Sequence, residues 1–362
     1  MKKLLKLIEA VRPTFEQGGK LRLFKPVFGA LEHFLFAPST TTMTAPHVRD
    51  PLDLKRFMSM AIISVVPSVL AALYFFGLRF LAMVVVSYAA GLTVEAIFAM
   101  VRKEGINEGF FVTGILFPLI LPPTLPLWMV GLGVAFGVFI GKELFGGTGR
   151  NVFNPALVGR CFLAFAYPKT MSASWLEPSH DLAGRLFAWV DASNVDALSS
   201  ATPLALAKQG EFSPLSHLFL GSVSGSAGET SAIAIIIGGV FLLLTRVANW
   251  RTVVSILGSF VLLGGVLHYA QPDTVGPVLW HLCAGGLLFG AFFMATDPVT
   301  SPTTNTGKWF YGIMIGSVTV LIRNFTGYVE GVTFAILLGN IVAPILDEIV
   351  VAVRIRRLAS EG

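Results

Sequence analysis

Long apolar runs separated by short polar stretches dominate this sequence. Ten of the runs approach the ~20 helical residues needed to cross a hydrocarbon layer of ~30 Å. They cover residues 57–78, 80–101, 109–122, 125–142, 152–168, 230–247, 252–270, 278–297, 308–323 and 329–350. The third and the eighth run contain interruptions. The pattern predicts an all-α membrane protein with about ten transmembrane helices, two of them broken.

Composition supports this prediction. Of the 362 residues, 54% are hydrophobic and 13% are charged, and the mean hydropathy is +0.75. Soluble globular proteins carry about 25% charged residues, so a water-soluble protein is excluded. The net charge of +5 does not indicate nucleic-acid binding, because ten of the 26 basic residues precede Phe57, where they suit anionic lipid headgroups.

The distribution of lysine and arginine predicts the orientation, because short cytoplasmic loops are enriched in these residues. With both termini in the cytoplasm, the basic turns all fall on the cytoplasmic side; they contain Arg102, Lys142, Arg246 and Lys308, among others. The segment 169–229, with three basic and six acidic residues, is then external. We therefore expect a basic cytoplasmic segment at 1–56, five helices at 57–168, this external loop, five helices at 230–350 and a cytoplasmic tail at 351–362.

Two stretches of the sequence are similar to each other. The order of two phenylalanines, a threonine, proline and a tryptophan at 110–128 returns at 292–309 with nearly the same spacing. Five spans separate the stretches, so the halves would have opposite orientations, as in inverted repeats whose broken helices meet at a central site. Chance similarity among apolar helices is the alternative. Backbone groups freed by such breaks must line a cavity or bind something, so we expect a ligand there.

Several motifs resemble those of one protein family. They are Asn107 to Thr113 (NEGFFVT), Pro122 to Trp128 (PPTLPLW), Lys142 to Leu157 (KELFGGTGRNVFNPAL), Phe292 to Pro298 (FFMATDP), Asn305 to Trp309 (NTGKW) and His47 to Arg56 (HVRDPLDLKR). Together they resemble the B subunit of the Na⁺-translocating NADH:quinone oxidoreductases. The D subunit of the Rnf complexes is related and ranks second, because the basic N-terminal extension and the GGTGRN turn look more like the Nqr protein.

The resemblance implies a covalent flavin at Thr202. Ser199 to Leu204 (SSATPL) is similar to the flavinylation motif S-x-A-T of this family, in which FMN is joined through its phosphate to the threonine hydroxyl. Such an ester needs an accessible hydroxyl that a flavin transferase can reach, and the external loop provides one. The alternative is an ordinary turn in which serine and threonine cap the backbone and Pro203 fixes φ.

Two further ligand sites are implied only by the resemblance. The turn from Gly146 to Asn151 lacks the preceding strand and the lysine of a P-loop, but the family implies a non-covalent riboflavin near it, with Asn151 and Asn154 offering amide groups. The alternative is a helix cap at Asn151. Gly91 corresponds to one glycine of a pair associated with the quinone, although Leu92 follows it here. A close packing contact between helices is the alternative.

Three acidic residues lie within apolar runs: Glu95, Asp297 and Asp347. A carboxylate at the centre of a bilayer costs about 2.5–3.5 kcal/mol or more, so such residues usually face an ion path or the protein interior. Each is a candidate for a Na⁺ path. The alternative, for Asp297 and Asp347, is a position at the cytoplasmic interface. The six histidines and two cysteines show no metal-ligand spacing, and we expect no metal cofactor and no catalytic acid, base or nucleophile.

The function that follows is a redox subunit in the bacterial inner membrane. Electrons would pass from FMN on Thr202 through riboflavin to ubiquinone or menaquinone, coupled to Na⁺ export, and partner subunits would supply NADH oxidation and an iron–sulfur relay. A passive solute channel is the competing hypothesis, because the inverted repeat also resembles the fold of urea transporters, and fold alone does not fix function. The S-x-A-T loop discriminates between the two, since a channel has no use for a flavin.

Overall fold

The computed structural model describes residues 10–15, 28, 54–103, 109–173, 175, 176, 178, 189, 201–272 and 275–361, and within these it is helical without any strand. The prediction of an all-α protein is therefore confirmed. The first half contains α3 (Leu54–Phe76), α4 (Leu78–Arg102), α5 (Gly109–Leu119), α6 (Leu127–Gly141), the 3-10 turn η2 (Glu143–Phe145) and α7 (Pro155–Ala166). The short helices α8 (Pro168–Ala173), α9 (Pro203–Ala207) and α10 (Leu215–Leu220) follow.

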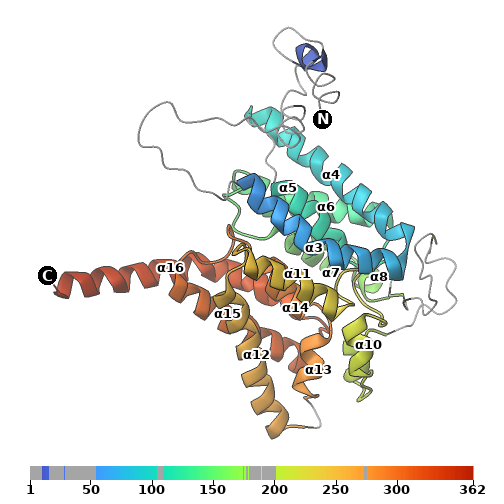
Figure 1. Cartoon of the computed structure of the whole chain (residues 1–362), viewed down its shortest axis with the longest axis vertical. Helices are drawn as coiled ribbons and strands as arrows, with labels where there is room; N and C mark the ends of the chain where they lie inside the picture. Colours follow the sequence, from blue (N-terminus) through green and yellow to red (C-terminus); the bar gives the residue numbers. More distant parts are fainter. Residues whose placement is uncertain are drawn as a thin grey trace.

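The second half begins at α11 (Ala232–Leu244) and continues through α12 (Trp250–Ala270), α13 (Val278–Cys283), α14 (Leu287–Phe289), the π-helical turn η4 (Gly290–Met294), α15 (Asn305–Phe325) and α16 (Val332–Glu361). Helices α3 and α11, the first of each half, pack against each other at the centre of the molecule. Figure 1 shows α4, α5 and α6 on one side of this pair and α12, α13 and α15 on the other. The last part of α16 extends away from the body and is fully exposed.

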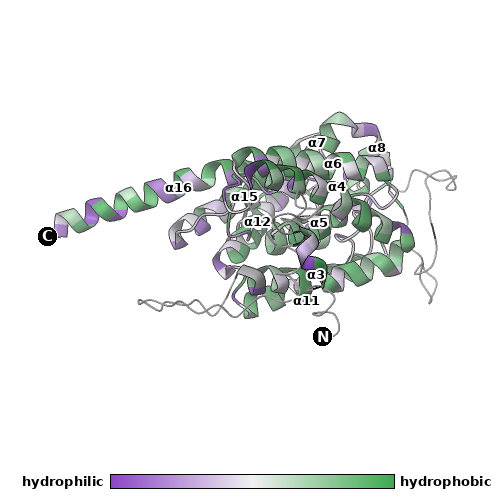
Figure 2. Cartoon of the chain, turned by 90° about the horizontal axis from the view of Figure 1, so that it is seen from above, coloured by the Kyte–Doolittle hydropathy of each residue, from purple (hydrophilic) through white to green (hydrophobic). Residues whose placement is uncertain are grey.

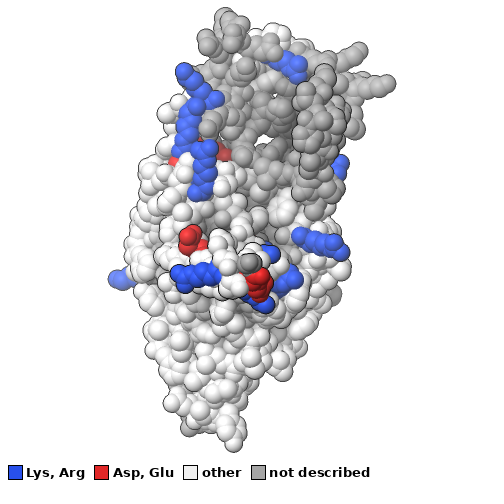
Figure 3. Space-filling view, turned by 90° about the vertical axis from the view of Figure 1, so that its left-hand side faces the viewer, with Lys and Arg blue, Asp and Glu red and all other residues white. Residues whose placement is uncertain are grey.

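Five helices are long and apolar enough to cross a membrane: Arg56–Phe76, Leu78–Arg102, Leu127–Phe145, Trp250–Ala270 and Val332–Glu361. Three further apolar helices, Gly109–Leu119, Pro155–Ala166 and Ala232–Leu244, are shorter. Each of the ten predicted apolar runs thus contains helix, but half of them are short, broken or less apolar than predicted. Figure 2 shows hydrophobic residues along most of the labelled helices, and Figure 3 shows few charged side chains on one face, with none on its lower part. The chain is a multi-pass membrane protein.

The two halves repeat the same order of packing. In the first half α6 lies against α4 and α7, and in the second half α15 lies against α12 and α16. The third element of each half, α5 or α14 with η4, packs on the first helix of its own half, α3 or α11. This agreement supports an internal repeat. The opposite orientation of the halves stays a prediction.

The first break follows α5, which ends at Leu119 before a proline-rich stretch without regular helix. The carbonyls that this end leaves open are bound by other parts of the chain. Ala227 N–H donates to the carbonyl of Leu121 (3.0 Å), and Gly228 N–H donates to that of Leu119 (2.7 Å). The guanidinium of Arg79 donates to two more carbonyls of the stretch, at 3.0 and 3.2 Å. The break is stable because every freed carbonyl named here has a donor.

The second break separates α13 from α14 and contains Gly285 and Gly286. Gly285 has φ +66°, and a Cβ there would overlap a carboxylate oxygen of Glu330. A Cβ on Gly286 would overlap a carboxylate oxygen of Glu229. Only glycine lets the backbone and the two carboxylates come this close. The π-helical turn η4 follows immediately, and such turns are frequent at functional sites.

The end of the predicted external loop lies inside the protein. Residues 226–230 are buried, although they are not helical, and they pass beside the first break. A buried loop needs internal partners for its backbone, and the carbonyls after α5 provide two of them. This part of the predicted external loop, which precedes α11, forms one wall of the site described next. The side of the membrane on which it lies stays a prediction.

Candidate functional site

Thr202 begins α9 as its N-cap. Its Oγ1 accepts a hydrogen bond from the N–H of Ala205 (3.3 Å), and Pro203 occupies the first helical position. The capping alternative is thus correct as a description of the local backbone. It does not conflict with an ester, because the cap uses a lone pair of Oγ1 and leaves the hydroxyl proton available for replacement. The side chain is half-buried.

Thr202 lines a cavity of about 420 Å³, which we call the outer cavity after its predicted side of the membrane. The volume lies within the range of about 300–1,000 Å³ typical of small-molecule sites. Much of the wall is apolar and comes from α8, α10, α16 and the segments that adjoin them. It includes Met171, Trp175, Leu218, Tyr328, Val329 and Phe334. The loop that carries Thr202 is fixed to this wall by Lys208, which donates to the carbonyls of Thr326 (2.7 Å) and Tyr328 (2.8 Å).

The floor of the outer cavity is charged. Arg160 from α7 forms an ion pair with Glu229 from the buried loop (3.0 Å) and donates to the hydroxyl of Ser226 (3.4 Å). Both charged side chains are more than nine-tenths buried. Burial raises the pKa of Glu229 above its ordinary value, and the neighbouring Arg160 offsets only part of this rise.

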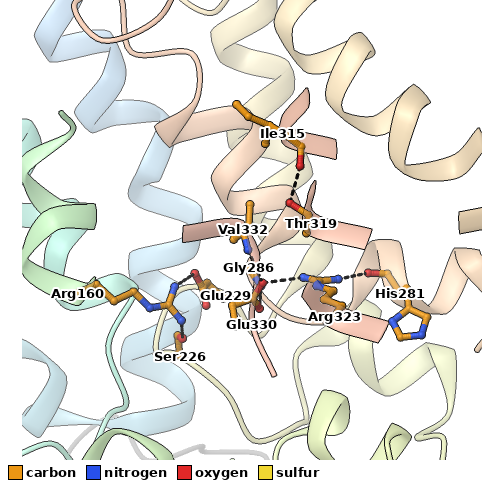
Figure 4. Close-up of polar contacts among 10 residues, drawn as sticks. All are labelled: Arg160, Ser226, Glu229, His281, Gly286, Ile315, Thr319, Arg323, Glu330 and Val332. Carbon is orange, nitrogen blue, oxygen red and sulfur yellow. Dashed lines mark hydrogen bonds and ion pairs between the residues drawn. The ribbon is translucent and has the colours of Figure 1, made fainter. Parts of the chain in front are cut away.

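A second ion pair continues this floor. Glu330 lies 2.9 Å from Arg323, and it also accepts from the N–H of Gly286 (2.9 Å). Arg323 in turn donates to the carbonyl of His281 on α13 (2.7 Å). Figure 4 shows the two pairs meeting at the second helix break, with Glu229 and Glu330 between the two arginines. The network is neutral as a whole and joins both halves of the molecule.

The outer cavity also contains side chains with unused bonding capacity. Within the described residues, the buried hydroxyls of Thr230 and Thr333 have no hydrogen-bond partner, although both residues line the cavity. Buried polar groups without partners are uncommon in native proteins and mark places where a ligand or water is expected. Cys161 and Cys283, both unpaired thiols, line the same cavity.

A smaller cavity of about 90 Å³, the inner cavity, lies between the two halves. It brings together three of the predicted residues, Asn151, Asn154 and Asp297. Asn154 caps α7, since its Oδ1 accepts from the N–H groups of Ala156 (3.0 Å) and Leu157 (3.4 Å). The predicted helix cap is therefore at Asn154, whereas Asn151 holds the preceding turn.

The carboxylates near the inner cavity have separate partners. Asp297 accepts from the hydroxyl of Thr300 (2.9 Å) and the N–H of Val299 (3.3 Å). Glu95 forms an ion pair with Lys142 (2.8 Å), whose side chain is only 3% exposed. Lys142, which the sequence predicts in a cytoplasmic turn, is buried and lines the inner cavity.

Two predicted site residues lie elsewhere. Asp347 on α16 accepts four hydrogen bonds, at 2.5 to 3.0 Å, from the backbone and hydroxyl groups of Thr303 and Thr304. It therefore holds the turn that leads into α15. Gly91 on α4 is buried, and a Cβ there would lie 2.5 Å from the ring of Phe110 and 3.3 Å from Val134. This agrees with a close packing contact among α4, α5 and α6.

Sequence reasoning missed the charged floor of the outer cavity. Arg160 lies in the middle of the predicted run 152–168, and a basic residue at such a position was a usable signal of function. Glu229 and Glu330 gave no such signal, because each falls at the edge of a run. The partners Arg160 and Glu229 are far apart in the sequence, so only the fold could pair them. Among the described residues, no cluster of histidine, cysteine, aspartate or glutamate has the form of a metal site.

The fold and the two cavities define a multi-pass helical membrane protein with paired broken helices and buried ligand-sized space. Residues 41–356 match the NQR2, RnfD, RnfE family, and the chain belongs to this family. The B subunit of the Na⁺-translocating NADH-quinone reductase of Azotobacter vinelandii is 38% identical, over 97% of this chain and 97% of its own length. The proteins of the same name from Pseudomonas aeruginosa and Klebsiella pneumoniae are each 38% identical over 98% or more of both chains.

Proposed function

We propose that this chain is the membrane-embedded B subunit of a Na⁺-translocating NADH:quinone oxidoreductase, a complex of several chains, and that it carries FMN as a phosphoester of Thr202. The observation that supports this most directly is the position of the Thr202 hydroxyl on the wall of a cavity of about 420 Å³. The near full-length similarity to proteins of that name supports the same assignment. A channel would have no use for a threonine so placed.

The residues of the outer cavity fit a flavin. Apolar and aromatic side chains suit the dimethylbenzene part of the ring, and the hydroxyls of Thr230 and Thr333 offer donors and acceptors to its polar edge. A bound flavin would supply the electron-transfer chemistry, which the amino acids of this chain lack. The chain itself would anchor the phosphate, exclude bulk water and set the electrostatic environment of the ring.

The inner cavity would serve the ion and the second flavin. Its volume of about 90 Å³ suits water molecules or a cation, since a water molecule occupies about 30 Å³ in the liquid. We assign Glu95 and Asp297 to a Na⁺ path past this cavity, with Asp347 holding the turn beside it. Riboflavin would bind at the rim near Asn151 and Asn154, where side chains must move to admit a ring. The quinone would approach α4 near Gly91.

The orientation follows from the basic turns. We assign both termini to the cytoplasm and the Thr202 loop to the periplasm of a bacterial inner membrane. Electrons would enter from a partner flavoprotein, and iron–sulfur and NADH-oxidising subunits would complete the path to ubiquinone or menaquinone. The Rnf-type alternative would use Thr202 in the same way. It ranks second because the near full-length relatives named above are all Nqr proteins.

In-gel flavin fluorescence of the denatured chain tests the proposal. The chain is expressed with its complex and flavin transferase, and wild type is compared with Thr202→Val. We expect a fluorescent band from wild type and none from Thr202→Val, because valine removes the hydroxyl with little change in shape. Thr230→Val removes a hydroxyl from the same cavity and should keep the fluorescence. An undiminished band from Thr202→Val would contradict the covalent attachment.

A further inference from the structure

The wall of the outer cavity has an unusual charge balance. Arg160, Glu229 and Glu330 line it, whereas Arg323 lies behind the wall with its side chain 1% exposed. A ligand in the cavity would therefore meet one positive and two negative groups directly. Charge in a low-dielectric site acts strongly on any reaction that changes the charge of the ligand.

The Arg160–Glu229 pair is unlike a device for stability. Moving two charges out of water costs several kcal/mol for each ion, and well-packed apolar residues often stabilise a protein as well or better. An ion pair that is buried yet borders a cavity gains little from packing on the cavity side. Its position at a cavity wall points to an electrostatic role toward whatever occupies the cavity.

Separate observations indicate that the cavity is built for a ligand. The hydroxyls of Thr230 and Thr333 are more than 95% buried and lack partners among the described residues. Both line the cavity beside the ion pair. Polar groups left in this way have a ligand or ordered water as the natural partner.

We propose that the Arg160–Glu229 ion pair sets the reduction potential of the flavin in the outer cavity, with Glu229 lowering the potential and Arg160 raising it. This inference rests on the proposed attachment of FMN to Thr202. Reduction brings an electron from the partner flavoprotein into the cavity. The negative carboxylate disfavours that added charge, and the guanidinium favours it, so the balance of the pair fixes how readily the ring is reduced.

A redox titration of the intact complex tests the proposal. The transition of the Thr202 flavin is obtained by subtracting the titration of the Thr202→Val complex. Glu229→Gln keeps an acceptor for Arg160 but removes the negative charge, and should raise the midpoint potential. Arg160→Gln should lower it. Each change should be on the order of tenfold in the redox equilibrium, which is about 59 mV for one electron, and the double variant should return toward wild type.

Opposite shifts from the two partners of one ion pair are the signature of an electrostatic role. A purely structural pair would give shifts of the same sign or none. Arg160→Lys keeps the charge and should keep the midpoint potential of wild type. It takes the place of Arg160→Gln in the test if that variant folds poorly. Glu143→Gln is the control, because the buried Glu143 pairs with the partly exposed Arg102 (2.7 Å) outside the outer cavity, and the change should leave the potential unchanged.

Thiol labelling shows separately whether the ring is in the cavity. Cys161 and Cys283 line it, so a maleimide should modify them more slowly in wild type than in Thr202→Val. Equal labelling rates in a chain that still carries covalent flavin would overturn this inference but not the proposed function. Protected thiols without any shift of the midpoint potential in the Arg160 and Glu229 variants would have the same consequence. A denatured chain without flavin fluorescence would overturn the proposed function and this inference together.

Discussion

The outer and inner cavities are built from similar parts but differ in size. Each has a buried ion pair at its wall: Arg160 and Glu229 both line the outer cavity, and Lys142, which pairs with Glu95, lines the inner cavity. The outer cavity measures about 420 Å³ and the inner cavity about 90 Å³. A buried ion pair therefore borders a ring-sized space in one cavity and a water-sized or ion-sized space in the other.

The lining residues of the two cavities differ in bulk. At the outer cavity two glycines, Gly285 and Gly286, bring the backbone against carboxylates, and Gly285 lines the cavity. At the inner cavity Met58, Phe293 and the long side chain of Lys142 line a much smaller space. The bulk of the lining side chains limits the size of the ligand that each cavity accepts.

The largest expected effect is at the inner ion pair. Lys142→Met removes the ammonium 2.8 Å from Glu95 and leaves a buried carboxylate without its counter-charge, which costs about 3–5 kcal/mol. Thermal unfolding of the complex in detergent, followed by tryptophan fluorescence, measures the loss. Arg160→Met at the outer pair should cost less, because the larger cavity can admit water to the remaining carboxylate.

The double variant Lys142→Met with Glu95→Gln is the control, since it leaves no uncompensated charge and should recover most of the stability. If Glu95 lies on the ion path, this stable double variant should still reduce quinone but lose its dependence on Na⁺. Wild-type stability in Lys142→Met alone would show that the inner pair is not buried as described.

The sequence predicted those parts of the two sites that depend on residues adjacent in the chain. The predicted capping role of Thr202 before Pro203 agrees with the N-cap of α9, whereas the predicted cap at Asn151 was wrong, since Asn154 caps α7. Local order also predicted the break after α5, because proline cannot continue a helix. The end of that helix was placed at residue 122 instead of Leu119, since the apolar run continues beyond the last helical residue.

The sequence could not predict which charges meet. The positive-inside rule places Lys142 on the cytoplasmic side, but no local pattern reveals that Glu95 lies beside it. Asp347 was interpreted as an intramembrane acid, because its partners Thr303 and Thr304 belong to another segment. Hydropathy locates charged residues along the chain, but only three-dimensional packing decides whether a charge faces a partner, a ligand or water.

Filling each cavity with the same side chain tests the difference in size. Ala61 lines the inner cavity and Ala164 the outer one. Ala61→Phe should destabilise the chain by about 1–3 kcal/mol, because overpacking a space of about 90 Å³ forces neighbours to move. Ala164→Phe should cost less than about 1 kcal/mol, because the ring can enter the larger cavity without overpacking it. The same thermal unfolding assay compares the two variants.

For quinone reduction the order of the two phenylalanine variants should be reversed, with the larger loss in Ala164→Phe. Ala164→Phe competes for the proposed ring site, so fluorescence on a denaturing gel should remain while quinone reduction falls at least tenfold. Ala61→Leu and Ala164→Leu introduce a side chain smaller than phenylalanine. They should give a smaller loss of stability and a smaller loss of quinone reduction, respectively. Equal destabilisation by phenylalanine at the two positions would show that the cavities do not differ in usable volume.

The smallest expected effect is at Asp347, which separates holding a turn from conducting an ion. Asp347→Asn keeps one acceptor oxygen but loses the second, so the hydrogen bonds to Thr303 and Thr304 are roughly halved. The residue is half-exposed, so the cost should be about 1 kcal/mol, as for the loss of a helix cap. Because the turn lies between Asp297 and α15, the Na⁺ concentration for half-maximal turnover should change less than in Asp297→Asn. A larger change from Asp347→Asn, with thermal stability intact, would place Asp347 directly on the ion path and extend the inner site to α16.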